Sequence, residues 1–453
     1  MSKKNKANRN LDRQAIQQQF KQVFDRFTAD QAFRKIAESD PDQAFQAYPL
    51  LDPQQALAAI RYARYRKPLL ENGNIYWELF RQLNERAMQL IRDRQASLSY
   101  ALEGIGDLAS RDLARMQLSS PLFRWNTNVI YVPVAFELSS GCSVQCPFCG
   151  LAAPKLTGLF RYTPENARLW QEVLQACREF IGSMAGMGPC YFATEPFDNP
   201  DYEKFMLDHR RIFGFASQTT TATADRNPAR IHAFMAWLGQ DELQQNALRF
   251  SIYSLSQLNR ILADYTPEEL VSIELLANNP ESDNRISRTG RCRENYKDAP
   301  KLTDYSISCL AGVWVSMSQR LMKWMEPEEP SADYPLGIRV LETRGFTDGD
   351  SFRKNLQEMI DHWAARGLPI DEKIGLHHKV WLERRGQLRI FHGEDIELKM
   401  GGNHSFGEAI DSLAEKPQSF SAMCRHLKIA EFPAAVIRQK LGILWQRGYL
   451  CRV

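Results

Sequence analysis

Three cysteines lie close together in one short segment, at Cys142, Cys146 and Cys149. Their spacing lets a tight loop turn all three thiols toward one point. In a cubane iron–sulfur cluster each iron takes one outer ligand, usually a thiolate. Thiolates from this loop would hold three of the irons and leave the fourth open to a further molecule. The segment therefore predicts a redox-active [4Fe-4S] cluster with an open iron.

The alternative interpretation of the same segment is a zinc site or a set of buried thiols. A structural zinc ion usually takes four protein ligands, and no fourth cysteine or histidine lies close by in the sequence, although one could come from elsewhere in the fold. Gly141 and Gly150 flank the loop and allow its backbone to bend tightly. These features favour the iron–sulfur cluster.

Length and composition set broad limits on the protein. The chain has 453 residues, which favours two or three domains, and a net charge of +3, which gives no reason to expect nucleic-acid binding. The basic first ten residues have no apolar stretch behind them, so we expect a disordered tail and no secretory signal. No long apolar run predicts a membrane span. We therefore expect a cytoplasmic, reducing location, where clustered cysteines indicate metal or redox chemistry.

Residue patterns divide the chain into three regions. Residues 1–120 are predicted to be a helical region behind the basic tail, because Phe20, Val23 and Phe27 recur at helical spacing and Asp52-Pro53 is typical of a helix start. Residues 121–330 alternate strands with helices, which predicts a parallel sheet wrapped by helices. The strands are expected at 129–138, 190–194, 215–221 and 248–253, and the helices at 163–183, at 228–238 and from 266 onward.

Residues 331–453 follow the acidic, proline-rich segment 326–333, which is predicted to be a linker. A helix is expected at 352–364, then a hairpin around Arg385-Gly386 in which Trp381 and Phe391 would be core residues. Helices at 405–413, 419–427 and 432–447 and a strand at 449–451 complete a pattern that suggests a winged helix.

The cysteine motif, with Phe148 before the last thiol, resembles that of the radical S-adenosylmethionine (SAM) superfamily. The resemblance implies an α/β fold with a partial (β/α)6 barrel in which SAM binds the open iron. Phe148 would then pack beside the adenine. Glu195, at the position of the family's Gly-Gly-Glu motif, would accept hydrogen bonds from the SAM amino group, although Ala193 and Thr194 replace the glycines. The remaining candidates for SAM contacts are Thr194, Thr220, Ser251, and Arg288 or Arg291.

More specifically, the chain is similar to the proteusin-type peptide epimerases of ribosomal natural-product pathways. The similar stretches are 136–142, 192–202, 265–270, 307–312 and 334–337. The resemblance implies that a 5′-deoxyadenosyl radical removes an α-hydrogen from an L-residue of a peptide, and that a cysteine thiol returns a hydrogen atom to the other face. Cys309 matches the family's donor, and Cys292 is the reserve candidate.

Two other functions stay open. One is a different radical SAM reaction, such as C–C or C–S bond formation or methylation, although no second cysteine cluster and no cobalamin motif is present. The other is a non-catalytic, metal-stabilised peptide-binding protein. For the epimerase, we expect the C-terminal winged-helix-like domain to bind the leader of a ribosomal precursor peptide, with possible help from the N-terminal helices. A flavodoxin or ferredoxin would supply electrons, and neither nucleic acid nor membrane is an expected partner.

Overall fold

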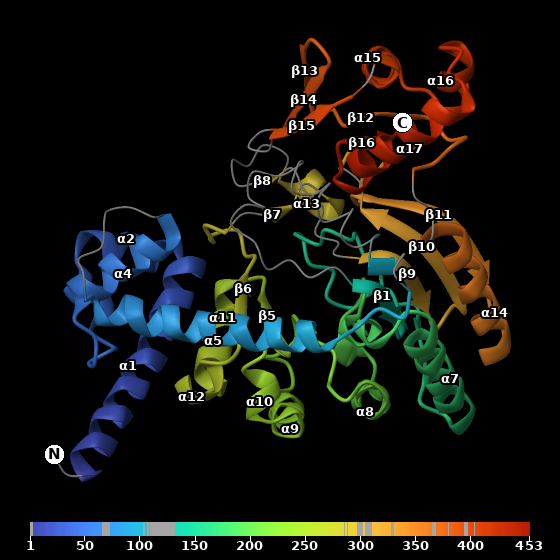
Figure 1. The fold of residues 1–453 in the computed structure, drawn as a ribbon. Coiled ribbons are helices and arrows are strands. Elements are labelled where there is room, and N and C mark those ends of the chain that lie inside the picture. The colour runs from blue at the N-terminus through green and yellow to red at the C-terminus, as the bar shows by residue number, and fades with distance from the viewer. Residues whose placement is uncertain are drawn as a thin grey trace.

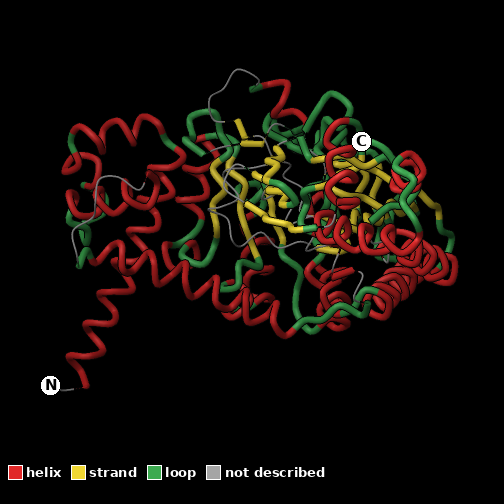
Figure 2. Tube along the Cα trace, turned by 45° about the horizontal axis from the view of Figure 1, so that its top comes forward, coloured by secondary structure: helices red, strands yellow, loops and turns green. Residues whose placement is uncertain are grey.

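The computed structural model describes residues 3–65, 73–102, 105–106, 108, 132–284, 286–287, 289–296, 302–303, 310–327, 330–364, 368–378, 380–393, 397–402 and 404–453. These residues form a mixed α/β structure with several separate sheets (Figure 1). Its strands gather in the middle of the molecule, with the N-terminal helices at one end (Figure 2). No helix within these ranges combines the length and the apolar character needed to cross a membrane.

The N-terminal region is helical, as predicted. Phe20, Val23 and Phe27 are buried in one apolar cluster, and Pro53 is the first residue of a helix. The first helix begins at Lys3, which differs from the disordered tail that the sequence predicts. Lysine, alanine and arginine favour helix, and no glycine or proline interrupts this stretch. The helices are α1 (Lys3–Ala29), α2 (Gln31–Ser39), α3 (Pro41–Phe45), α4 (Pro53–Tyr65) and α5 (Ile75–Ser97).

The first sheet has four strands in the order β1-β9-β10-β11: β1 (Val132–Glu137), β9 (Leu310–Ser316), β10 (Leu321–Pro327) and β11 (Ile338–Gly345). The strands β1 and β9 run parallel, and their register pairs Glu137 with Ser316. The other two pairs are antiparallel. Helices α7 (Pro164–Phe180) and α14 (Gly349–Met359) cover one face, where Trp170 and Phe352 share an apolar cluster with Phe136.

The second sheet is parallel and follows the predicted alternation of strand and helix. Its strands are β4 (Thr219–Thr221), β5 (Leu248–Ile252) and β6 (Glu274–Ala277). Leu248, Phe250 and Ile252 of β5 are buried in the same apolar cluster as the helices, so Arg249 and Ser251 face the other way. The surrounding helices are α8 (Tyr202–Phe213), α9 (Pro228–Leu238), α10 (Gln240–Leu243), α11 (Leu255–Asp264) and α12 (Pro267–Leu270).

The two sheets do not join into a closed barrel. Residues 190–194, predicted to be a strand, form only a single bridge between Tyr191 and Glu137. The backbone nevertheless lies beside β1, because the Phe192 N–H donates to the Phe136 carbonyl at 3.0 Å. Ala193 then takes a positive φ of 57°. That turn ends the extended conformation, so a ladder cannot continue.

The C-terminal region confirms the predicted hairpin and three helices. Phe391 is buried as expected, but Trp381 is 57% exposed, so its assignment to the core is wrong. The elements are β12 (Ile374–Leu376), β13 (Trp381–Arg385), β14 (Leu388–His392), β15 (Glu397–Gly401), α15 (His404–Glu415), α16 (Phe420–His426), α17 (Glu431–Gln446) and β16 (Leu450–Arg452). The strands form two small sheets, β12-β16 and β13-β14-β15.

The predicted linker 326–333 begins inside β10 and leads to the strand that β10 pairs with. Glu326 is buried, and its Oε2 lies 2.6 Å from Nη1 of Arg452 in the last strand. The region boundary predicted at residue 330 therefore falls between β10 and β11, which are paired strands of one sheet. Glu326, from the segment predicted to be a linker, joins the C-terminal region to the first sheet.

Candidate iron–sulfur and cofactor site

The cysteine loop connects two short paired strands, β2 (Ser139–Ser140) and β3 (Gly158–Leu159), directly after β1. Gln145 holds the loop together from within. It has a φ of 54°, and its Nε2 lies 2.8 Å from the Cys142 and Pro154 carbonyls and 3.0 Å from the Ala153 carbonyl. Gly141 has a φ of 83°, and a Cβ there would lie 2.3 Å from the Lys155 carbonyl oxygen. The tight bend expected at Gly141 is therefore present.

A short helix, α13 (Gly290–Asn295), holds the loop from outside. The Arg291 N–H donates to the Cys149 carbonyl and its Nε to the Cys146 carbonyl, both at 2.9 Å. The Asn295 side chain donates to the Pro147 carbonyl at 2.8 Å. A Cβ at Gly290 would lie 2.5 Å from the Cys149 carbonyl oxygen, so only glycine permits this approach. The backbone of the cysteine loop is thus fixed from α13.

Arg291 was a candidate for contact with SAM, and the structure gives it a different set of partners. Its Nε and Nη1 both donate to carbonyls of the cysteine loop. Its Nη2 is buried and has no hydrogen-bond partner among the described residues. Cys292, the reserve hydrogen donor, is buried beneath the same loop, and its thiol donates to the Phe148 carbonyl.

The three thiols are half-buried and lie near enough to influence one another electrostatically. Burial, together with the neighbouring Cys142 and Cys149, raises the pKa of the Cys146 thiol to about 12. Burial also raises the pKa of Cys142. Within the described residues, no group of three or more His, Cys, Asp or Glu side chains is arranged to hold a metal ion. The donor chemistry, three thiols from one fixed loop, fits the outer ligands of a cubane cluster.

Glu195 lies beside this loop and is almost fully buried. Its Oε1 accepts from the hydroxyls of Thr221 at 2.6 Å and Thr223 at 3.1 Å and from the Phe197 N–H at 3.3 Å. Its Oε2 accepts from the Ala222 N–H at 2.9 Å. Burial raises the pKa of the carboxyl to about 7, and the hydrogen bonds from Thr221 and Ala222 oppose that rise.

The structure brings some of the other predicted residues toward the loop. The Thr194 hydroxyl donates to the Gly141 carbonyl at 2.6 Å, so it holds the loop directly. Thr220 on β4 bonds to the Tyr191 hydroxyl at 2.8 Å and accepts from Arg249 Nε at 2.9 Å. Ser251 shares the face of Arg249 on β5. Phe148 is half-buried within the loop. Cys309 and Arg288 lie outside the described residues.

One buried acid near the loop was not among the predicted site residues. Glu137, the last residue of β1, is 5% exposed, and its Oε1 accepts a hydrogen bond from Ser316 at 2.9 Å. Burial raises the pKa of the carboxyl to about 7, while Ser316 and the Lys323 ammonium lower it. The signal in the sequence is a single acid at the end of an otherwise apolar strand.

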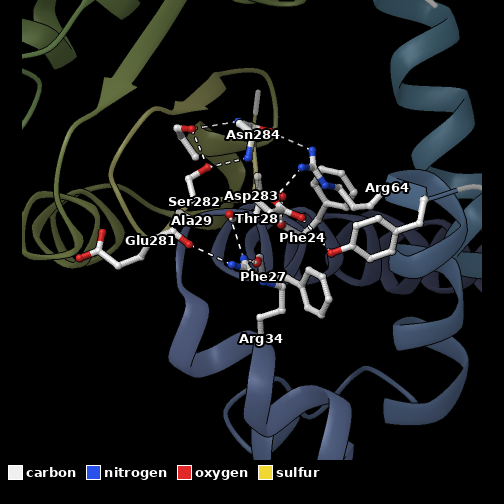
Figure 3. Close-up of polar contacts among 12 residues, drawn as sticks. Phe24, Phe27, Thr28, Ala29, Arg34, Arg64, Glu281, Ser282, Asp283 and Asn284 are labelled. Carbon is white, nitrogen blue, oxygen red and sulfur yellow. Dashed lines mark hydrogen bonds and ion pairs between the residues drawn. The ribbon is translucent and has the colours of Figure 1, made fainter. Parts of the chain in front are cut away.

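The N-terminal helices hold the segment that leads from β6 toward α13 (Figure 3). Arg64 donates to the side chains of Asp283 at 2.6 Å and Asn284 at 2.9 Å. Arg34 donates to the Glu281 carbonyl at 2.9 Å, and the Asp283 N–H donates to the Thr28 carbonyl at 3.2 Å. Because Asp283 lies only seven residues before Gly290, these contacts anchor the approach to the helix that holds the cysteine loop.

Comparison with known proteins gives one curated relative without an assigned activity. The chain is 36% identical over 237 residues to the uncharacterized protein y4wI of Sinorhizobium fredii. The match covers 50% of this chain and 46% of that protein, so the chain spans about half the length of the relative it matches. No protein-family model matches the chain, and no solved structure matches it.

Proposed function

We propose that this protein is a radical SAM enzyme that converts L-residues to D-residues in a ribosomally made precursor peptide. The observation that carries the proposal is the cysteine loop. Cys142, Cys146 and Cys149 come from one turn whose backbone is fixed on two sides, by Gln145 from within and by α13 from outside. A [4Fe-4S] cluster held by these thiols keeps one iron for SAM. In this proposal the two sheets are the halves of a partial (β/α)6 barrel.

SAM would lie between the cysteine loop and the turn at Glu195. When bound to the reduced cluster, it supplies the radical that removes the α-hydrogen. Glu195 supports this site because its Oε2 accepts only one hydrogen bond from the described residues, which leaves capacity for the SAM ammonium group. Ser251 shares the face of Arg249 on β5, and Thr220 accepts a hydrogen bond from Arg249; both are proposed to contact the ribose or carboxylate of SAM. Phe148 and Arg288 complete the proposed set.

The proposed hydrogen donor is Cys309, with Cys292 in reserve. The structure gives Cys292 a bond to the Phe148 carbonyl and a position beneath the loop. That placement supports a packing role for Cys292 and keeps Cys309 as the first candidate. The donor must return its hydrogen atom to the face of the α-carbon opposite the one that the radical attacked.

The proposed partners are the leader of the precursor peptide and an external reductant, a flavodoxin or ferredoxin. The C-terminal region supports leader binding because β13 is an edge strand of a three-stranded sheet. An extended peptide can add to such an edge through backbone hydrogen bonds. Trp381, on the same strand, is exposed and stacks on His392 with an interplanar angle of 12°. It offers an aromatic surface beside the edge.

The test begins with anaerobic reconstitution. We expect about four irons per chain, and 5′-deoxyadenosine formed from SAM after reduction. Replacing any one of Cys142, Cys146 and Cys149 by alanine should abolish both, whereas the matched control Cys424→Ala, in the C-terminal region, should abolish neither. A protein that binds zinc or no metal contradicts the proposal and favours the non-catalytic peptide-binding protein.

A second measurement separates epimerisation from other radical SAM reactions. With the precursor peptide in D2O, each inverted α-carbon should gain one deuterium and no other mass. A methyl gain or a loss of hydrogens would instead indicate methylation or crosslinking. Cys309→Ala should still form 5′-deoxyadenosine but no D-residue, while Cys292→Ala should retain D-residue formation.

A further inference from the structure

A pocket of about 580 Å³ lies at the edge of the second sheet where its parallel strands begin. Its walls are α1, α5 and the two segments that lead into β5 and β6 (Figure 1). Glu195 accepts its hydrogen bonds from Thr221 and Ala222 at the opposite edge, where β4 ends. The pocket is therefore separate from the proposed SAM site, and its volume is typical of a ligand site.

Hydrogen bonds between the walls hold the pocket in shape. Gln17 Nε2 on α1 donates to the Leu79 carbonyl on α5 at 2.8 Å. Lys21 Nζ, one turn further along α1, donates to the Ile273 carbonyl just before β6 at 3.1 Å. Because α1 is joined directly to both other walls, the pocket is formed before a ligand enters it. A ligand therefore does not have to order these elements when it binds.

The lining combines apolar side chains with primary amides. Leu83 and Ile91 of α5 belong to the apolar part and can contact one large apolar side chain of a ligand. An amide group both donates and accepts hydrogen bonds, which suits the N–H and C=O groups of a peptide backbone. The amide side chains of the lining are Gln14, Gln17, Gln82, Asn84, Gln244 and Asn246.

The acids at the pocket have partners of opposite charge. Asp25 Oδ2 lies 2.5 Å from Nζ of Lys21, which lines the pocket. Glu274 also lines the pocket, and its Oε2 lies 3.8 Å from Nη1 of Arg249. Neither carboxylate therefore stands alone beside the pocket, and the charge of Lys21 is balanced.

Two further cations give the pocket its net positive charge. Arg13 on α1 and Arg86 on α5 both line it and are both exposed. Within the part of the chain that the structure describes, neither guanidinium forms an ion pair or a hydrogen bond. A guanidinium group binds a carboxylate through charge-assisted hydrogen bonds. The pocket therefore favours a ligand that is acidic.

We propose that this pocket binds a segment of the precursor peptide in which acidic residues flank a large apolar residue. The carboxylates pair with Arg13 and Arg86, the apolar side chain contacts Leu83 and Ile91, and the amides bond to the peptide backbone. The identity of the peptide rests on the proposed function, whereas the preference for an acidic peptide does not. Because the pocket is at the opposite edge of the sheet from Glu195, it anchors the peptide without occupying the proposed SAM site.

The binding test uses the full chain without iron or SAM. Fluorescence anisotropy compares a labelled peptide of glutamate and leucine with one of lysine and leucine. Only the acidic probe should bind, and salt should weaken its binding. Combining Arg13→Glu with Arg86→Glu should weaken it by about tenfold, because two exposed ion pairs become repulsions. The matched control is Arg81→Glu, since Arg81 is an exposed residue of α5 that is absent from the lining and should not affect binding.

A substitution in the apolar part of the lining tests the second half of the proposal. Leu83→Ala keeps every charge and should weaken binding of the acidic probe by about fivefold, because apolar contact area is lost. Leu83 is only half-buried, so the variant should still fold, and circular dichroism checks this. Equal binding of the acidic and basic probes, or no binding of either, would overturn the proposal.

Two further measurements separate the pocket from the other possibilities. In the D-residue assay, the two-arginine variant should raise KM for the precursor peptide by about tenfold with kcat unchanged. An unchanged KM overturns the pocket assignment. In sedimentation experiments, a wild-type dimer that this variant dissociates would identify a second copy of the chain as the occupant and also overturn it. A protein that binds the acidic probe but makes no D-residue overturns the epimerase function and leaves the pocket assignment standing.

Discussion

The turn at Glu195 and the end of β1 at Glu137 each contain a buried carboxyl group with a pKa raised to about 7. Their surroundings differ. Four groups donate to Glu195, from Thr221, Thr223, Ala222 and Phe197. Only Ser316 among the described residues donates to Glu137. A raised pKa alone therefore does not distinguish the two sites. The number of donors does, because four donors hold the Glu195 carboxyl group in one position, whereas a single donor among the described residues holds that of Glu137.

The largest expected difference between the two sites is in stability. Glu195→Ala leaves four buried donors without an acceptor and should lower the free energy of unfolding by ~3–4 kcal/mol. Glu137→Ala leaves one hydroxyl that can turn toward Ser318 and should cost ~1 kcal/mol. Urea unfolding followed by circular dichroism measures both. Equal losses would mean that the donor count does not separate the sites.

The contribution of each carboxyl group to folding stability should depend on pH in a similar way at the two sites. Each folded-state pKa lies above the unfolded value, so each group's contribution to stability is complete below about pH 4.5 and is lost as the pH rises through about 7. The loss is on the order of 3 kcal/mol per carboxyl group. The variants Glu195→Gln and Glu137→Gln should each weaken the dependence of the free energy of unfolding on pH between pH 4 and pH 8, because each removes one titrating carboxyl group. A slope that neither variant changes would show that other groups control the titration.

A substitution that removes a single hydrogen-bond donor should produce a smaller difference in the free energy of unfolding between the two sites. Thr221→Val deletes the shortest bond to Glu195, 2.6 Å, and should cost ~1–2 kcal/mol, whereas Ser316→Ala should cost ~1 kcal/mol. Both changes should raise the pKa of the carboxyl concerned, because each hydroxyl stabilises the ionised form. Carboxyl signals in carbon-13 NMR spectra report the pKa. A fall in either pKa would contradict the assigned bond.

The smallest expected loss of stability comes from a substitution on the face of β4 opposite Thr221. Thr220 bonds to Tyr191 and Arg249, and it does not contact Glu195 through any hydrogen bond. Thr220→Val should therefore cost at most ~1 kcal/mol and leave the Glu195 titration unchanged. Thermal unfolding measured beside Thr221→Val provides the comparison. A loss as large as that of Thr221→Val would show that both faces of the strand support the carboxyl.

The sequence predicted the local elements well and the contacts between distant segments poorly. The hydrophobic patterns of β1, α9 and β5 and the terminal helices were readable because each pattern is local. Residues 190–194 looked like a strand, but Ala193 turns the backbone by its positive φ. Glu326, in the segment predicted to be a linker, lies within β10 for a related reason. A buried ion pair with Arg452 depends on a partner 126 residues away.

The residues of the candidate site also divide into those that a local motif indicates and those that depend on contacts between distant segments. The three thiols and Glu195 could be named from the motif and its surroundings. The role of Arg291 was assigned to SAM because the sequence does not show that its guanidinium donates to carbonyls of the cysteine loop. Glu137 was missed because a single acid at the end of an apolar strand acquires meaning only when Ser316 and Ser318 are placed beside it.

The contacts of Arg34 and Arg64 with the segment after β6 bear on how the protein can be shortened. A chain cut before β1 would keep every residue proposed for chemistry. It would also remove both guanidinium groups and leave the Asp283 carboxylate without its cation. The segment that enters α13 would then lose its support, and the cysteine loop would loosen although no residue within it had changed. Attempts to isolate a minimal catalytic core should therefore retain the first hundred residues.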